Sequence, residues 1–87
     1  MLYIGADHRG FKLKEALKLY LKELYFSFED LGALELILDD DYPDYAIPVA
    51  QKVSQNPKEN LGILICGSGV GVDITANKFK WVRSALI

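Results

Sequence analysis

"LGILICGSGVG", residues 61 to 71, is the stretch that decides the fold of this chain. Its first six residues are apolar without alternation, which is typical of a strand buried on both faces in the centre of a parallel sheet. Three glycines follow at alternate positions, and the next residues predict a helix from about Gly71 to Lys78. A strand that leads through a glycine loop into a helix belongs to an alternating α/β fold. The only cysteine, Cys66, lies where this strand meets the loop.

The first part of the chain shows the same alternation. "LYIGA", residues 2 to 6, predicts a buried strand, and the helical spacing of apolar residues predicts an amphipathic helix over 11–25. "FSFEDLG", residues 26 to 32, alternates apolar and polar residues like a second strand. The residues expected to face the core from the first helix are Leu13, Leu17, Tyr20 and Leu24.

A long connection follows and leads to a second predicted helix, from about Tyr45 to Gln55. Asp44 is its expected N-cap, and Pro48 is expected in its first turn, where proline is tolerated. "VRSALI", residues 82 to 87, predicts a fourth strand. The elements predict one domain over residues 1–87 with a three-layer α/β/α Rossmann-like parallel sheet of about four strands and three helices. Because an alternating fold seldom stops on an apolar strand, we expect this domain to be incomplete at its C-terminus.

Composition excludes several classes of function. The chain has 87 residues, of which 51% are hydrophobic and 25% charged, with a formal charge of -2. This balance gives no electrostatic reason to expect nucleic acid or a membrane surface as partner. One cysteine and one histidine exclude an internal disulfide and a Cys/His zinc cluster, and we expect a cytoplasmic protein. The high hydrophobic fraction indicates that some apolar surface meets a partner chain.

The glycine loop does not match the familiar phosphate and cofactor motifs. A P-loop requires Lys-Ser or Lys-Thr after its last glycine, which is absent here. A dinucleotide-binding loop requires a glycine at position 72 or 74, where the chain has Val72 and Ile74. A cysteine-phosphatase loop requires an arginine at position 72. None of these three functions is expected.

The loop can instead line a hollow with backbone N–H groups at a helix N-terminus. Such a nest binds an anion or an oxygen on which negative charge develops. A helix N-terminus also favours the thiolate form of a nearby cysteine. Cys66 could then remove a proton next to a carbonyl or act as a nucleophile. The alternative is a small buried cysteine that only ends a strand.

A second polar stretch follows the first predicted strand. Ligands of open parallel sheets bind beyond the carboxyl ends of the strands, so Asp7, His8 and Cys66 meet if their strands are neighbours. The position of His8 between Asp7 and Arg9 favours anion binding. The acidic run 39–41 lacks the spacing of a calcium loop and is expected to be a solvated turn. Nothing here predicts a metal.

Four segments together resemble the type B ribose-5-phosphate isomerases and the related galactose-6-phosphate isomerase subunits. The resemblance covers essentially the whole chain, and the combination of the four is more specific than any glycine pattern alone. The segments are "IGADHRGFKLKEAL" (4–17), "DYPDYA" (41–46), "GILICGSGVG" (62–71) and "ANKFKWVRSAL" (76–86).

The resemblance implies an aldose–ketose isomerase of a phosphorylated sugar that works without metal or cofactor. It implies that Cys66 is the base that moves a proton through an enediolate, with Ser68 where members carry Ser or Thr. The amides of the loop from Gly67 to Gly71 would stabilise this intermediate. The residues implied to bind substrate are Asp7, His8, Tyr42, Gly67, Gly69, Val70 and Gly71.

Members of this family are considerably longer than this chain. The part without a counterpart here carries a ring-opening histidine, phosphate-binding arginines and a further strand that separates the third and fourth strands. We therefore expect little or no turnover from these 87 residues alone. Members are usually dimers, which implies a homodimer or higher homo-oligomer. The alternatives are a sugar-phosphate or anion-binding module without chemistry and a self-associating chain, and the identity of the sugar stays open.

Overall fold

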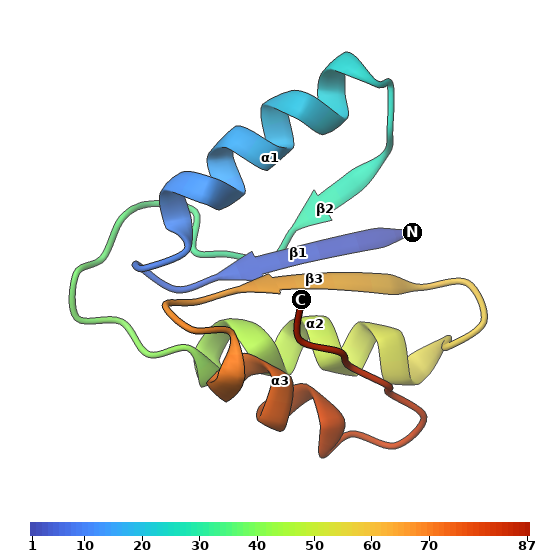
Figure 1. Ribbon diagram of the computed structural model, residues 1–87. Coiled ribbons are helices and arrows are strands. Elements are labelled where there is room, and N and C mark those ends of the chain that lie inside the picture. Colours follow the sequence, from blue (N-terminus) through green and yellow to red (C-terminus); the bar gives the residue numbers. More distant parts are fainter.

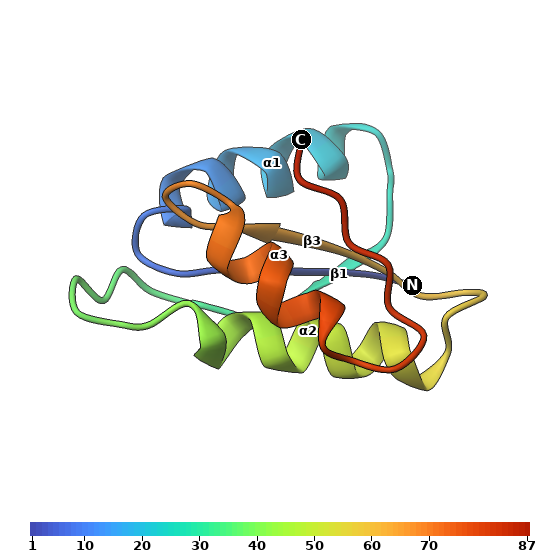
Figure 2. The same ribbon diagram turned by 60° about the horizontal axis from the view of Figure 1, so that its bottom comes forward.

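The computed structural model describes residues 1–87 and contains one parallel sheet between two layers of helix (Figure 1). Its elements are, in chain order, β1 (Leu2–Ala6), α1 (Phe11–Glu23), β2 (Phe28–Asp30), α2 (Pro43–Gln55), β3 (Leu61–Ile65) and α3 (Val70–Asn77). The strands lie in the order β2-β1-β3. Helix α1 covers one face of the sheet, and α2 covers the other with α3 beside it (Figure 2). The predicted α/β/α architecture is therefore confirmed.

The central strand is β1, not β3. All five residues of β1 are buried, and the strand pairs in parallel with β2 on one edge and with β3 on the other. Strand β3 lies at the edge of the sheet, so the prediction of a central strand at 61–66 is wrong. The expected burial on both faces is also wrong, because the residues of β3 are exposed or half-buried. An apolar run indicates that a strand can be covered on both faces. It does not show whether a strand pairs with both edges, because those hydrogen bonds come from the backbone.

Residues 82–87 form no strand, which corrects the prediction of a fourth one. Two hydrogen bonds tie this tail to the end of α3: the Ser84 amide donates to Asn77 Oδ1 at 2.8 Å, and Asn77 Nδ2 donates to the Ser84 carbonyl at 3.1 Å. These side-chain contacts occupy backbone groups that a sheet would need. The tail passes in front of β3 without pairing with it (Figure 2). It lines an apolar groove of about 570 Å³ together with β3, Leu13 and Leu17.

The face that α1 turns to the core differs from the predicted one. Leu13 is 62% exposed, and Tyr20 and Leu24 are also exposed. The buried residues of α1 are Lys14 and Leu21, with half-buried Leu17 between them. Of the four predicted core residues only Leu17 packs against the core, and the buried positions lie about one residue further along the helix. The reason is that Lys14, a residue normally assigned to the surface, points inward to a carboxylate.

Helix α2 begins two residues before the predicted start. Its first residue is Pro43, which needs no N–H partner at that position, and its N-cap is Tyr42 without a side-chain hydrogen bond. Asp44 lies in the first turn and is not the cap, and Pro48 lies inside the helix rather than in the first turn. Strand β2 is shorter than the predicted stretch, and α3 starts and ends one residue earlier than predicted. None of the helices has the length and apolar character needed to cross a membrane.

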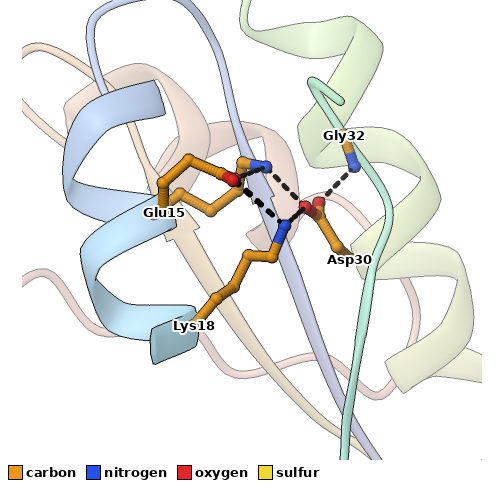
Figure 3. Close-up of polar contacts among 5 residues, drawn as sticks. Glu15, Lys18, Asp30 and Gly32 are labelled. Atoms are coloured by element: carbon orange, nitrogen blue, oxygen red, sulfur yellow. Dashed lines mark hydrogen bonds and ion pairs between the residues drawn. The ribbon is translucent and has the colours of Figure 1, made fainter. Parts of the chain in front are cut away.

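A cluster of four charged side chains joins α1 to β2 (Figure 3). Lys14 is fully buried, and its Nζ lies 2.6 Å from Asp30 Oδ2 and 2.9 Å from Glu15 Oε2. Lys18 Nζ contacts the same two carboxylates, at 2.7 Å and 3.1 Å. The other oxygen of Asp30 accepts a hydrogen bond of 2.8 Å from the Gly32 amide. Every charge in the cluster has a partner of opposite sign, which burial of Lys14 and Asp30 requires.

This cluster makes stability depend on pH. Burial alone would raise the pKa of Asp30, but the contacts from Lys14, Lys18 and the Gly32 amide outweigh it and lower this pKa below 3.8. The Lys14 contact likewise lowers the pKa of Glu15, and the Asp30 contact raises the pKa of Lys18 above 10.5.

The two carboxylates therefore contribute stability that is complete above their ordinary pKa and is lost as the pH falls through the lowered values. Lys18 contributes stability that is complete below pH 10.5 and is lost above its raised value. We expect the contribution of this cluster to the free energy of unfolding, measured in urea, to be constant between about pH 5 and 10. It should decrease below and above that range. An Asp30→Asn variant should lose less of its stability on acidification than the parent. An equal acid loss in both proteins would contradict this assignment.

Candidate active site

A polar cavity of about 350 Å³ lies at the carboxyl ends of β1 and β3. The connection after β1 leads to β2 on one side of β1, and the connection after β2 leads to β3 on the other side. The carboxyl ends of β1 and β3 therefore form the switch point at which open parallel sheets bind ligands. The cavity brings together Asp7 and His8, which follow β1, with Cys66, which follows β3. The residues that line it are Asp7, His8, Arg9, Asp40, Asp41, Tyr42, Cys66, Gly67, Ser68 and Gly71.

Cys66 lies directly after β3, half-buried, with its sulfur in contact with the glycine loop. The Gly69 amide donates a hydrogen bond of 3.1 Å to Cys66 Sγ. Gly69 is the N-cap of α3 and has a positive φ of 81°, a conformation that favours glycine. The thiol therefore lies at the N-terminus of a helix and faces a backbone donor, as the glycine loop led us to expect.

Ser68 lies next to this contact and supports the same turn. Its Oγ accepts a hydrogen bond of 3.2 Å from the Val70 amide. Because Oγ acts as acceptor there, the hydroxyl hydrogen is free to be donated to another group. Val70 itself begins α3 with an exposed side chain and does not line the cavity.

All three glycines of the loop lie where a side chain would collide with a neighbour: Gly69 faces Leu86 of the C-terminal tail, and the other two face walls of the cavity. A Cβ on Gly71 would come within 2.6 Å of the Tyr42 ring, so the ring packs directly on the backbone at this position. A Cβ on Gly67 would come within 2.7 Å of the Arg9 side chain. The absence of side chains thus lets Tyr42 and Arg9 form walls of the cavity against bare backbone.

Asp7 shapes the loop that follows β1. It is buried, and its Oδ1 accepts hydrogen bonds from the amides of Arg9 and Gly10, at 3.0 and 3.2 Å. Its other oxygen makes no hydrogen bond within the protein. Asp7 therefore fixes the entry into α1 with one oxygen, and the second stays available to a ligand.

His8 is held by a residue that the sequence did not single out. Asp40 Oδ1 lies 2.8 Å from His8 Nδ1 and also accepts a 2.8 Å hydrogen bond from the His8 amide. Burial alone would raise the pKa of Asp40, but these contacts from His8 and one from Tyr45 lower it below its ordinary value. Burial and the nearby Asp40 carboxylate raise the pKa of Tyr45.

The prediction that residues 39–41 form a solvated turn is therefore wrong for Asp40, whose side chain is only 5% exposed. Asp39 and Asp41 are exposed as expected. The contact joins positions 32 residues apart, and nothing in the acidic run distinguishes the middle residue. Arg9 and Asp41 also line the cavity and were not predicted as site residues. No group of three or more His, Cys, Asp or Glu side chains is arranged to hold a metal ion.

The chain resembles curated proteins over nearly its whole length. A profile of the family described as Ribose/Galactose Isomerase matches residues 2–87. A probable ribose-5-phosphate isomerase B from Mycoplasma genitalium is 48% identical over 86 residues, a match that covers 99% of this chain and 57% of that protein. Ribose-5-phosphate isomerase B from Mycobacterium tuberculosis is 42% identical over 85 residues, covering 98% of this chain and 52% of that protein.

The chain also resembles solved structures of ribose-5-phosphate isomerases B. The crystal structure of ribose-5-phosphate isomerase B from Mycoplasma genitalium with bound ribulose-5-phosphate matches with a TM-score of 0.95 and 48% identity, covering 99% of this chain and 57% of that one. A type B ribose 5-phosphate isomerase from Trypanosoma cruzi matches with a TM-score of 0.86 and 42% identity, again covering 99% and 57%. The chain thus spans little more than half the length of these relatives.

Proposed function

Because the chain belongs to the ribose/galactose isomerase family, we propose that its cavity supports the interconversion of an aldose phosphate and its ketose phosphate. Ribose 5-phosphate and ribulose 5-phosphate are the pair we favour, since two relatives carry ribose-5-phosphate isomerase B in their names and the crystal structure from Mycoplasma genitalium contains bound ribulose-5-phosphate. The observation that carries the proposal is the thiol of Cys66, which lies on the cavity with a backbone amide 3.1 Å from its sulfur.

The proposed chemistry is a proton transfer between two carbons. The Cys66 thiolate removes the proton from C2 of the open-chain aldose, and the C–H electron pair forms the C1–C2 double bond while negative charge moves to O1. The thiol then returns the proton to C1, the electrons reform the carbonyl at C2, and a proton passes from O2 to O1. No net oxidation occurs, so this step requires no cofactor.

The glycine loop has two tasks in this scheme. Before the transfer, the Gly69 amide donates its hydrogen bond to the sulfur and fixes its position at the start of α3. Once sulfur holds the proton it is a poorer acceptor, and amides at the start of α3 can turn to the enediolate oxygens. We propose that the Ser68 hydroxyl, whose hydrogen is free, donates to one of these oxygens.

The remaining cavity residues are assigned to substrate binding. We propose that Asp7 and His8 contact the sugar phosphate, that Tyr42 forms a wall of the pocket, and that Arg9 adds positive charge beside the phosphate. Phosphorylated sugars occur inside cells, so we propose a cytoplasmic setting. The family resemblance is the ground on which we propose a homodimer or higher homo-oligomer.

The proposal is tested by hydrogen exchange on ribulose 5-phosphate in D₂O, followed by NMR. A 5-phosphorylated ketopentose cannot close a five-membered ring through its C5 oxygen, so the assay needs only proton transfer and not ring opening. We expect deuterium to replace one of the two C1 hydrogens, because a proton removed by Cys66 exchanges with solvent before it returns. Exchange above the level of buffer supports the proposal.

Calorimetry with the same compound separates the alternatives. Binding without exchange contradicts the proton-transfer proposal and supports a sugar-phosphate-binding module. Absence of both contradicts any sugar-phosphate function for these residues, and size-exclusion chromatography over a range of concentrations then tests the self-associating chain.

A further inference from the structure

The contact between Asp40 and His8 has an unusual form for a surface loop. A single oxygen, Oδ1, faces both the backbone amide and the ring Nδ1 of His8, each at 2.8 Å. The second oxygen, Oδ2, is buried and makes no hydrogen bond of good geometry, although the Tyr45 hydroxyl lies near enough to the carboxylate to lower its pKa. The Asp40 side chain is 5% exposed, whereas the His8 ring is 25% exposed and lines the cavity.

This arrangement decides which ring nitrogen carries a proton. The lowered pKa of Asp40 keeps it a carboxylate at neutral pH, and a carboxylate only accepts hydrogen bonds. His8 Nδ1 must therefore be the donor, whether the ring is neutral or charged. His8 Nε2 makes no hydrogen bond within the protein, and it is the nitrogen left for a ligand.

We propose that Asp40 is a positioning residue that keeps His8 protonated at Nδ1 and presents Nε2 to the phosphate of the substrate. The assignment of the ligand rests on the proposed function. A charged ring oriented in this way donates Nε2–H to a phosphate oxygen while Nδ1–H still faces Asp40. The buried Asp40 carboxylate holds the ring in this orientation.

The first test reads the tautomer directly. His8 is the only histidine, so ¹⁵N NMR of the tag-free, histidine-labelled protein gives one pair of ring signals without assignment. In the neutral ring we expect Nδ1 to carry the proton. In Asp40→Ala the ring should revert to the Nε2-protonated form that an unrestrained imidazole favours.

Asp40→Asn provides a rescue. The His8 amide requires an acceptor at the Oδ1 position, so the asparagine oxygen should occupy it and keep Nδ1 protonated. The matched control is Asp39→Ala, which removes the same charge from the neighbouring exposed position and should keep the parent tautomer. A neutral parent ring protonated at Nε2, or an unchanged tautomer in Asp40→Ala, would overturn the proposal.

The second test measures the affinity for ribose 5-phosphate by calorimetry, with inorganic phosphate as the minimal probe. We expect Asp40→Ala to bind ribose 5-phosphate about tenfold more weakly, Asp40→Asn to bind between it and the parent, and Asp39→Ala to bind like the parent. Unchanged affinity in Asp40→Ala would contradict the ligand assignment. If the Asp40 variants change the tautomer and the affinity but the protein shows no hydrogen exchange, the proposed isomerisation is rejected and the positioning role of Asp40 is retained.

Discussion

In the Cys66→Ala variant, the rate of C1 hydrogen exchange on ribulose 5-phosphate should fall about a thousandfold, which is within the range that a positioned general base contributes. Alanine removes the only group at the end of β3 that can take a proton from carbon. The cavity lining and the Gly69 turn otherwise remain, so binding of the sugar phosphate should change little. NMR exchange rates and calorimetric affinities on the same samples separate the two effects.

Two further variants sharpen this result. Cys66→Ser keeps an acceptor for the Gly69 amide but replaces a thiol by a far weaker acid, so its exchange should also fall close to background. Lys58→Ala, in the exposed turn before β3, should exchange like the parent. Exchange that survives in Cys66→Ala would show that another group removes the proton, and the assigned role of the thiol would be wrong.

The largest effect on stability is expected from Asp30→Ala, at about 3 kcal/mol of unfolding free energy. Lys14 is fully buried, and without Asp30 it would keep only Glu15, whose side chain is 41% exposed. Removing one partner of a buried pair leaves the other charge poorly compensated. A loss of this size is a large fraction of the roughly 4 to 13 kcal/mol typical of a domain of this length. Urea unfolding followed by circular dichroism measures it.

The neighbouring residue supplies the control. Glu29 lies on the same strand but is exposed and takes no part in the cluster, so Glu29→Ala should change the unfolding free energy by less than about 0.5 kcal/mol. In Asp30→Ala combined with Lys14→Met, most of the loss should be recovered, because no unpaired charge then remains buried. A double variant as unstable as Asp30→Ala would argue against charge compensation as the cause.

Several predicted site residues line the observed cavity because they directly follow the carboxyl ends of parallel strands. Residues directly after parallel strands lie at one edge of the sheet whatever the packing, so Asp7, His8 and Cys66 were found from local pattern and the assumption that their strands are neighbours. Tyr42 came only from the family resemblance, and the predicted residues Gly69 and Val70 do not line the cavity. Their roles in catalysis and binding stay predictions until the variants are measured.

The sequence by itself determined the alternation of strands and helices, the three layers and the cysteine at the mouth of a glycine loop. These features are local, since apolar runs, helical periodicity and glycine spacing act over a few residues. Only the tertiary structure decided that β1 is central, that residues 82–87 stay outside the sheet, that Lys14 points inward to Asp30, and that Asp40 holds His8. Each of these features depends on a group distant in the sequence, which either hydrogen-bonds to the edge of a strand or compensates a buried charge. Such groups come together only when the helices and strands pack.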